Sequence, residues 1–208
     1  MLNKTSPLLL IMGLVLVSGC GSSSNGSSHS TSSSSAAGAG GGQEGGAALA
    51  ADARSAATGD IPDTQNFLTL RAVRPRVSML YPEGWTVQET ASRVSIADKN
   101  NLVRISVSGG PTPTAASVRA QLAALGRSTP GLKTSAAGVV SLKSGPAVKA
   151  TYTTQSLPSP VTGKRVTLTV DRYVLAHGGR VAVIDLGTPV GVDNVDAYRR
   201  MIESFKWL

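Results

Sequence analysis

Apolar and polar residues alternate along much of the chain beyond residue 68, with the period of strands in a half-buried β-sheet. The strand patterns lie at 76–87, 93–98, 102–108, 138–145, 147–154, 164–176 and 180–187. The first of them contains a turn, because Pro82 and Gly84 occupy the positions that a type I turn prefers. Lys-Asn-Asn at 99–101 and His177 with its two following glycines separate neighbouring patterns, so both predict hairpin turns.

The apolar spacing changes to that of a helix in two places. The first helix has Thr114 as its expected N-cap and Gly126 as its expected end, and the second has Asp193 as its expected N-cap. The apolar faces consist of Val118, Leu122 and Leu125 in the first helix, and of Val195, Tyr198, Ile202 and Phe205 in the second. Strands, one helix, further strands and one helix predict an α+β fold in which helices cover an antiparallel sheet.

The beginning of the chain has a different pattern, typical of export. Residues 8–17 are ten consecutive apolar residues, about half of the number that a membrane-spanning helix needs. Ten is the usual length of the apolar part of a secretory signal, and the small residues Ser18 and Gly19 follow it as a cleavage site requires. Residues 1–19 are therefore predicted to be a signal peptide.

The stretch Val17-Ser18-Gly19-Cys20 resembles a bacterial lipobox, although the family favours leucine where Val17 stands. The resemblance implies cleavage before Cys20 and a diacylglycerol on its sulfur, with palmitate as an acyl group. Two or more acyl chains anchor a protein stably, so we expect a lipoprotein on the extracytoplasmic face of the cell membrane. The alternative is that Cys20 is an incidental small residue at the end of an uncleaved anchor.

A low-complexity segment follows Cys20. Between residues 21 and 50 there are ten Ser, eight Gly and six Ala, a composition that cannot bury enough apolar surface to offset its backbone entropy. Residues 20–60 are therefore predicted to be a lipidated, disordered tether, and residues 61–208 one globular domain. Because Cys20 is the only cysteine, disulfides cannot stabilise that domain.

Positive charge is the main functional signal in the predicted domain. The whole chain carries +8, and from Asp63 onward 18 Lys and Arg stand against nine Asp and Glu, giving +9. The possible contacts to an anionic surface are Arg71, Arg74, Arg76, Lys164, Arg165, Arg199 and Arg200. Beside a membrane, these side chains favour anionic lipid, a polyanionic wall polymer or an envelope protein as partner. The alternative is that the excess charge reflects composition only.

Nucleic acid is not expected, because export separates the protein from it and basic residues do not alternate with aromatic ones.

The sequence contains no catalytic motif, no cluster at metal-ligand spacing and no cofactor fingerprint in a suitable context, so catalytic residues, metals and cofactors are not expected. His177 is read as a turn residue. Asp185, which lies within an apolar strand, is expected to form a buried salt bridge, with Arg172 across the hairpin as the candidate partner. The alternative is that Asp185 acts as a general base.

Three segments, SMLYPEGWTV, RISVSGGPTP and YRRMIESFKW, together resemble the PsbP-like superfamily, and with the lipobox they are similar to its LpqN-type lipoproteins. The resemblance covers roughly Val73 to Trp207. It implies an α-β-α sandwich with a central antiparallel sheet, in which the Tyr-Pro-Glu-Gly turn and Trp85 are structural. It implies no shared enzyme activity, because members of this fold are mostly binding or assembly factors.

The sequence thus predicts a lipid-anchored, non-catalytic binding or scaffolding module of the bacterial envelope. One alternative is a carrier that holds a lipid or glycolipid in a crevice between sheet and helix. A third possibility, a hydrolase, would need a His–Asp–Ser cluster around His177.

Overall fold

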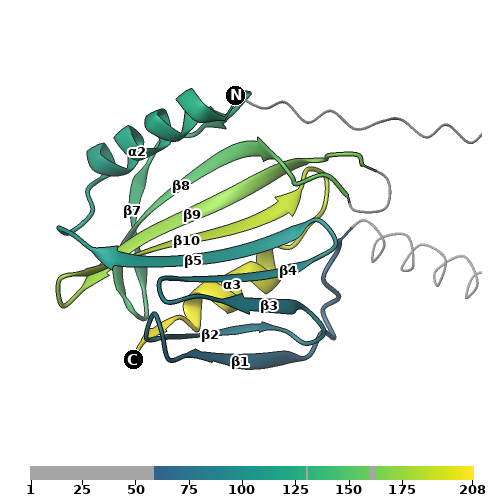
Figure 1. Cartoon of the computed structure of the whole chain (residues 1–208), viewed down its shortest axis with the longest axis horizontal. Coiled ribbons are helices and arrows are strands. Elements are labelled where there is room, and N and C mark those ends of the chain that lie inside the picture. Colours follow the sequence, from purple (N-terminus) through teal and green to yellow (C-terminus); the bar gives the residue numbers. More distant parts are fainter. Residues whose placement is uncertain (1–58, 130, 160–162) are drawn as a thin grey trace, which may run out of the picture. The chain divides into compact units, whose positions relative to one another are not determined.

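The alternating segments form a large antiparallel sheet in the computed structural model, which describes residues 59–208 except 130 and 160–162 (Figure 1). Within this part of the chain the large sheet has eight strands, in the order β3-β4-β5-β10-β9-β8-β6, with β7 also paired to β8. Its strands are β3 (Thr86–Glu89), β4 (Arg93–Asp98), β5 (Asn101–Gly109), β6 (Lys133–Thr134), β7 (Gly138–Leu142), β8 (Gly145–Gln155), β9 (Thr167–His177) and β10 (Arg180–Pro189). Both predicted hairpins, β4–β5 and β9–β10, are confirmed.

A second, small sheet lies beside the first. It consists of β1 (Phe67–Ala72), β2 (Val77–Pro82) and β11 (Lys206–Trp207), in the order β1-β2-β11. The predicted strand pattern at 76–87 is therefore divided between two sheets, since β2 belongs to the small sheet and β3 to the large one. Gly84 lies in the turn between β2 and β3. Its φ of 90° is a backbone conformation that favours glycine.

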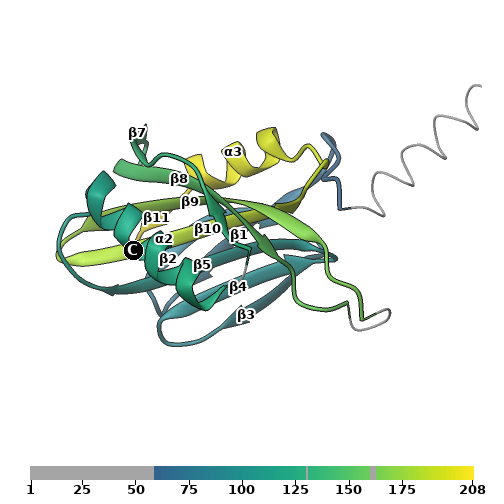
Figure 2. The same ribbon diagram turned by 90° about the horizontal axis from the view of Figure 1, so that it is seen from above.

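The two described helices cover opposite faces of the large sheet (Figure 2). On one face, α2 (Ala115–Ser128) packs Val118 and Leu122 against β8 and β9. On the other face, α3 (Val195–Glu203) and the small sheet pack against the remaining core. The predicted α+β fold, an α-β-α sandwich around an antiparallel sheet, is confirmed.

Side chains alternate between the two faces of each strand, so the large sheet contributes to two hydrophobic cores. In β9, Val170 and Val174 point to α2, whereas Tyr173 and Leu175 point to the core that contains α3. Neighbouring residues of a strand point to opposite faces, so an almost continuous apolar run is needed where both faces are covered. Each large side chain buried in this way contributes about 1.5–3 kcal/mol.

The first predicted helix is largely confirmed. The side chain of Thr114 accepts a hydrogen bond from the backbone N–H of Ser117, and Ser117 returns the contact, which makes a capping box. Gly126 does not end the helix, which continues to Ser128. A single glycine within the last turn costs about 1 kcal/mol relative to alanine, which packing of the preceding turns offsets.

The second helix differs from its prediction at its beginning. Asn194 occupies the N-cap position, and Asp193 accepts a hydrogen bond from the backbone N–H of Val195 at 3.2 Å. Val195 is 63% exposed, so its assignment to the buried face was wrong. The buried face begins one turn later, at Tyr198, and Phe205 is buried just beyond the helix.

The strand predicted at 164–176 begins three residues later than expected. Lys164 and Arg165 therefore lie in the connection before β9, not on alternate faces of a strand.

The predicted signal peptide at 1–19 and nearly all of the predicted tether at 20–60 lie outside the described residues, and so do Val17, Ser18, Gly19 and Cys20. The description begins at Gly59, whose carbonyl oxygen accepts hydrogen bonds from the side-chain amides of Asn101 and Asn194. Within the described ranges, no helix is long and apolar enough to cross a membrane.

Candidate functional site

Basic side chains gather where the β1–β2 turn meets the end of β11. Arg74 and Arg76 lie on this turn and are exposed, and Arg71 precedes them on β1. Ser78 of β2 pairs with Arg71 on one side and with Lys206 of β11 on the other. Residues that pair directly point to the same face, so Arg71 and Lys206 flank Ser78 on one surface of the small sheet.

Arg180, at the start of β10, holds this turn in place. Its guanidinium donates hydrogen bonds to the carbonyl oxygens of Pro75, of Arg76 at 3.1 Å and of Leu208 at 3.5 Å. The same guanidinium lies 4.9 Å from the ring centroid of Trp207, a cation–π contact. Arg180 therefore positions the backbone and adds charge at the same place. We call this region, which carries Arg71, Arg74, Arg76, Arg180 and Lys206, the basic end.

His177 also lies at the basic end, in a setting that differs from a catalytic one. Its ring stacks on that of Trp207, with 6.0 Å between centroids, at the β9–β10 turn. Among the described residues it forms no hydrogen bond or ion pair, so neither a carboxylate nor a hydroxyl is in place to act with it.

Two buried side-chain polar atoms have no hydrogen-bond partner in the described part of the chain. They are Nε1 of Trp207 and Oγ of Ser144, which lies in the turn between β7 and β8. Buried polar atoms are nearly always hydrogen-bonded, so the unsatisfied Nε1 of Trp207 is an unusual feature of the basic end.

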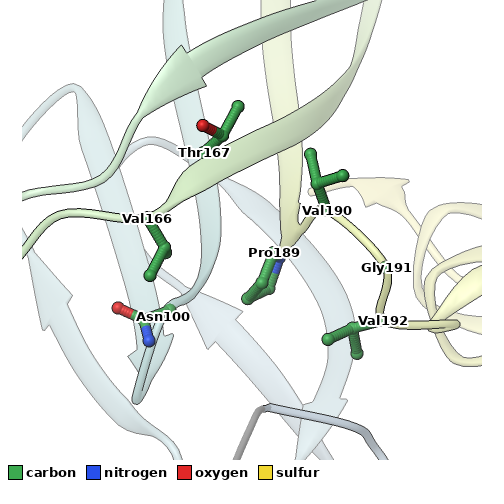
Figure 3. A pocket seen from close by; sticks show the side chains of 7 residues that line it. All are labelled: Asn100, Val166, Thr167, Pro189, Val190, Gly191 and Val192. Atoms are coloured by element: carbon green, nitrogen blue, oxygen red, sulfur yellow. The ribbon is translucent and has the colours of Figure 1, made fainter.

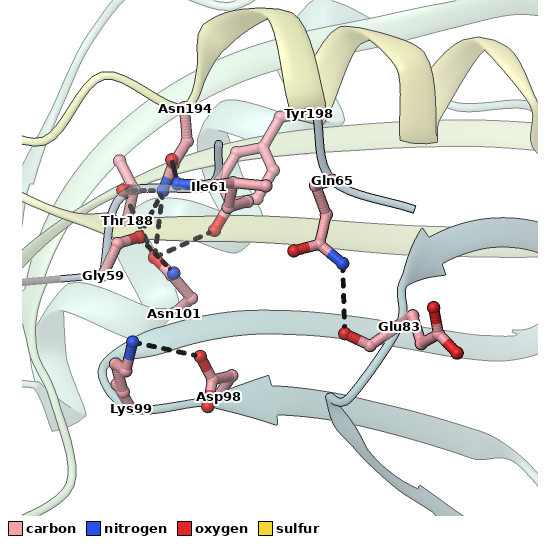
Figure 4. Close-up of polar contacts among 10 residues, drawn as sticks. All are labelled: Gly59, Ile61, Gln65, Glu83, Asp98, Lys99, Asn101, Thr188, Asn194 and Tyr198. Atoms are coloured by element: carbon pink, nitrogen blue, oxygen red, sulfur yellow. Dashed lines mark hydrogen bonds and ion pairs between the residues drawn. The ribbon is translucent and has the colours of Figure 1, made fainter. Parts of the chain in front are cut away.

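The opposite end of the large sheet carries most of the acidic residues. Here the segment from Gly59 meets Asn101 at the start of β5 and Asn194 at the start of α3 (Figure 4). The β2–β3 turn is joined to it through Gln65, whose side chain donates to the carbonyl oxygen of Glu83 at 3.2 Å. We call this the acidic end; its carboxylates are Asp60, Asp63, Glu83, Asp98, Asp193 and Asp196. The 11 residues of β9 separate the two ends by about 35 Å.

The acidic end is held together by amide groups. The side chain of Asn194 accepts a hydrogen bond from the backbone N–H of Ile61 at 2.8 Å and donates to Asn101 at 3.1 Å (Figure 4). The hydroxyl of Tyr198 donates to the carbonyl oxygen of Gly187 at 2.6 Å, and burial raises its pKa well above the usual range. This network is structural, because its members satisfy one another.

The other four predicted cations do not join the basic end. Lys164 and Arg165 lie before β9, towards the acidic end, where Arg165 donates to the carbonyl oxygen of Ser156 at 2.8 Å. On α3, Arg199 forms an exposed ion pair with Asp196 at 2.7 Å. Arg200 lies over the ring of Phe67, 4.3 Å from its centroid. Of the seven predicted contacts, the structure thus groups only Arg71, Arg74 and Arg76.

The predicted pairing of Asp185 is confirmed. Arg172 donates to both carboxylate oxygens, at 2.7 and 2.8 Å, and Asp185 is 2% exposed. Burial lowers the pKa of Arg172, but its hydrogen bonds and attraction to Asp185 outweigh burial and raise that pKa. Burial, with the nearby charge of Asp185, raises the pKa of Tyr152 to about 12. Both oxygens of the Asp185 carboxylate therefore accept hydrogen bonds from Arg172, so this carboxylate is not available as a base.

A hollow of about 780 Å³ opens near the acidic end (Figure 3). It lies between the start of β9 and the connection from β10 to α3, and most of its side chains are apolar. It is lined by Asn100, Val166, Thr167, Pro189, Val190, Gly191 and Val192. Its size is within the range of small-molecule sites.

Among the described residues, no group of three or more His, Cys, Asp and Glu side chains lies so that it could hold a metal ion.

Comparison with solved structures identifies the type of fold. No protein-family model matches the chain, and no curated protein matches it. The solution structure of cyanobacterial PsbP (CyanoP) from Synechocystis sp. PCC 6803 is similar, with 15% identity, 72% of this chain and 98% of that chain covered, and a TM-score of 0.50. The Ran-binding protein Mog1p of Saccharomyces cerevisiae also matches, with 8% identity, coverage of 68% and 95%, and a TM-score of 0.46. The likeness to CyanoP shows that the domain has a PsbP-like fold.

Proposed function

We propose that this PsbP-like domain is the binding module of an LpqN-type bacterial lipoprotein. It is held on the extracytoplasmic face of the cell membrane through acylated Cys20 and presents its basic end to an anionic partner in the envelope. The observation that carries the proposal is the gathering of cations from both termini of the domain at this end. Arg74 and Lys206 are 132 positions apart in sequence, yet the fold brings both to the small sheet, away from the acidic end.

Two features support a non-catalytic role. His177 stacks on Trp207 and has no acid or hydroxyl partner among the described residues. Asp185 is occupied by Arg172. A nucleophile and a base in mutual reach are what a hydrolase would need, and the surroundings of these two residues do not supply them.

The anchor is tested by moving the thiol. Cys20→Ser should abolish labelling by an alkyne fatty acid and leave an unprocessed precursor, because the acyl acceptor is lost. Adding Ser22→Cys to that variant returns a thiol two residues further on, outside the lipobox, and should not restore the label. Equal labelling of Cys20→Ser and the unaltered chain would refute the anchor.

The hollow favours a second candidate function, a lipid or glycolipid carrier, because its apolar lining suits an acyl chain. If the domain is a carrier, a fluorescent fatty acid should bind in the hollow. Val192→Arg would then weaken binding at least tenfold, since a charge would enter an apolar site. Val139→Arg, at an apolar position on β7 that is 71% exposed, serves as the control. Equal binding by both variants, or none by the unaltered chain, would remove this candidate.

A further inference from the structure

The tip of the basic end combines exposed apolar surface with positive charge. Val73, at the start of the β1–β2 turn, is 79% exposed, and Arg74 follows it directly. Leu208, whose backbone N–H donates to the carbonyl oxygen of Arg76 at 3.0 Å, is 38% exposed at the same place. A single exposed apolar residue is ordinary on a protein surface. Val73 differs because it lies on an exposed turn, among cations.

The cations at this tip are available to bind an external anion. Arg71, Arg74, Arg76 and Lys206 are exposed, and none of them forms an ion pair with another described residue. Five cations elsewhere on the described domain do form ion pairs, as Arg199 does with Asp196.

The turn is also preformed. Arg180 fixes the backbone of Pro75 and Arg76 from the neighbouring hairpin, and Trp207 lies beneath its guanidinium. Arg76 has φ of 64°, a conformation that is uncommon for a residue with a side chain and that the surrounding contacts must maintain. A preformed turn loses little conformational entropy when it binds, so weak contacts suffice.

We propose that the basic end docks on the anionic surface of the membrane, with Val73 entering the headgroup region and Arg71, Arg74, Arg76 and Lys206 contacting lipid phosphates. This inference rests on the proposed function, because the acyl anchor keeps the domain near the surface. Lipid is favoured over a wall polymer because a polyanion would explain the cations but not the apolar tip. Each cation near an anionic surface strengthens attraction by about fivefold.

Docking in this orientation is compatible with the position of the anchor. The described chain begins at Gly59, at the acidic end, about 35 Å from the tip. The 38 residues 21–58 connect it to Cys20. Fully extended, such a length of chain reaches about 130 Å. The acyl chains and the basic end can therefore contact the same membrane.

The test uses the acylated mature protein in vesicles, with Trp207 as the reporter at the basic end. Vesicles contain phosphatidylglycerol or only phosphatidylcholine, and both types carry lipids with a nitroxide on the headgroup, which quenches tryptophan that lies near the headgroups. Quenching is expected with phosphatidylglycerol at low salt, and its loss at 0.5 M salt, where the Debye length falls to roughly 4 Å. Trp85 is buried in the core near the acidic end and provides a constant background.

Two variants separate charge from apolar contact. Arg74→Glu with Lys206→Glu should reduce the affinity of the unacylated chain for anionic vesicles at least tenfold. Val73→Ser, which leaves the charge unchanged, should reduce quenching by half or more. The control Arg119→Glu with Arg127→Glu makes the same charge change at exposed positions of α2 and should have less than a threefold effect on affinity.

The outcomes distinguish the inference from the proposed function. If the acylated protein does not float with vesicles of either type, the proposed anchor is wrong. If it floats but Trp207 is quenched equally in all variants, or not at all, docking by the basic end is refuted while the anchor stands. If the unacylated chain instead binds a soluble teichoic acid through Arg74 and Lys206, with no lipid quenching, the partner is a wall polymer and the membrane inference fails.

Discussion

Alanine in place of Phe205 is expected to lower the free energy of unfolding by about 3–5 kcal/mol. Phe205 is 1% exposed and lies between the end of α3 and β11, where its ring meets that of Trp207 edge-on at 5.4 Å. Its removal leaves a cavity between α3, the small sheet and the large sheet, which the surrounding backbone cannot close fully. That loss is a large share of the 5–15 kcal/mol typical of a whole domain.

Urea titration of the chain from Gly21 measures this effect. Val195→Ala provides a control in the same helix, because Val195 is 63% exposed, and it should change stability by about 0.5 kcal/mol or less. A loss under about 1 kcal/mol for Phe205→Ala would mean that the C-terminal segment is not packed on the core as the structure has it.

Removing the carboxylate of Asp185 should destabilise the domain by a similar amount, about 3–5 kcal/mol in Asp185→Ala. The variant leaves the guanidinium of Arg172 on the sheet without its two hydrogen bonds, and the side chain of Arg172 is only 12% exposed. The large effect comes from the unpaired charge rather than from the net strength of the salt bridge.

Two comparisons test that reason. Asp185→Leu combined with Arg172→Met removes both charges and should recover most of the loss, because the remaining surroundings are largely apolar. Asp196→Ala breaks an exposed pair with Arg199 and should cost about 0–1 kcal/mol. If the double variant is as unstable as Asp185→Ala, an unpaired guanidinium is not the cause.

Local sequence patterns predicted much of the fold. The capping residue Thr114, the β4–β5 hairpin and the turn after His177 depend on neighbours within a few residues, and all three are as predicted. The pairing of Arg172 with Asp185 follows from the same turn, because the hairpin register places those two residues directly opposite each other. Where the turn determines the register, sequence alone identifies the cross-strand partner.

The small sheet could not be predicted in the same way. β11 has two residues, too few for a period to be visible, and β1 exposes half of its six positions. Lys206 pairs with Ser78 across 128 positions of sequence, a contact that no local pattern determines. The exposure of Val195 has a related cause, since only the packing of α3 decides which part of its apolar face is covered.

The sequence by itself determined that the domain is rich in positive charge, that its strands are antiparallel and that Cys20 stands in a lipobox-like stretch. It did not determine which cations act together, because charge carries no period from which the facing of a side chain can be inferred. Only the tertiary structure brought Arg180 and Lys206 to Arg74 and Arg76, and placed Lys164 towards the other end. The basic end results from strand pairing between segments that are far apart in sequence. The backbone hydrogen bonds of these strands, and not the charges, determine which of those side chains lie together.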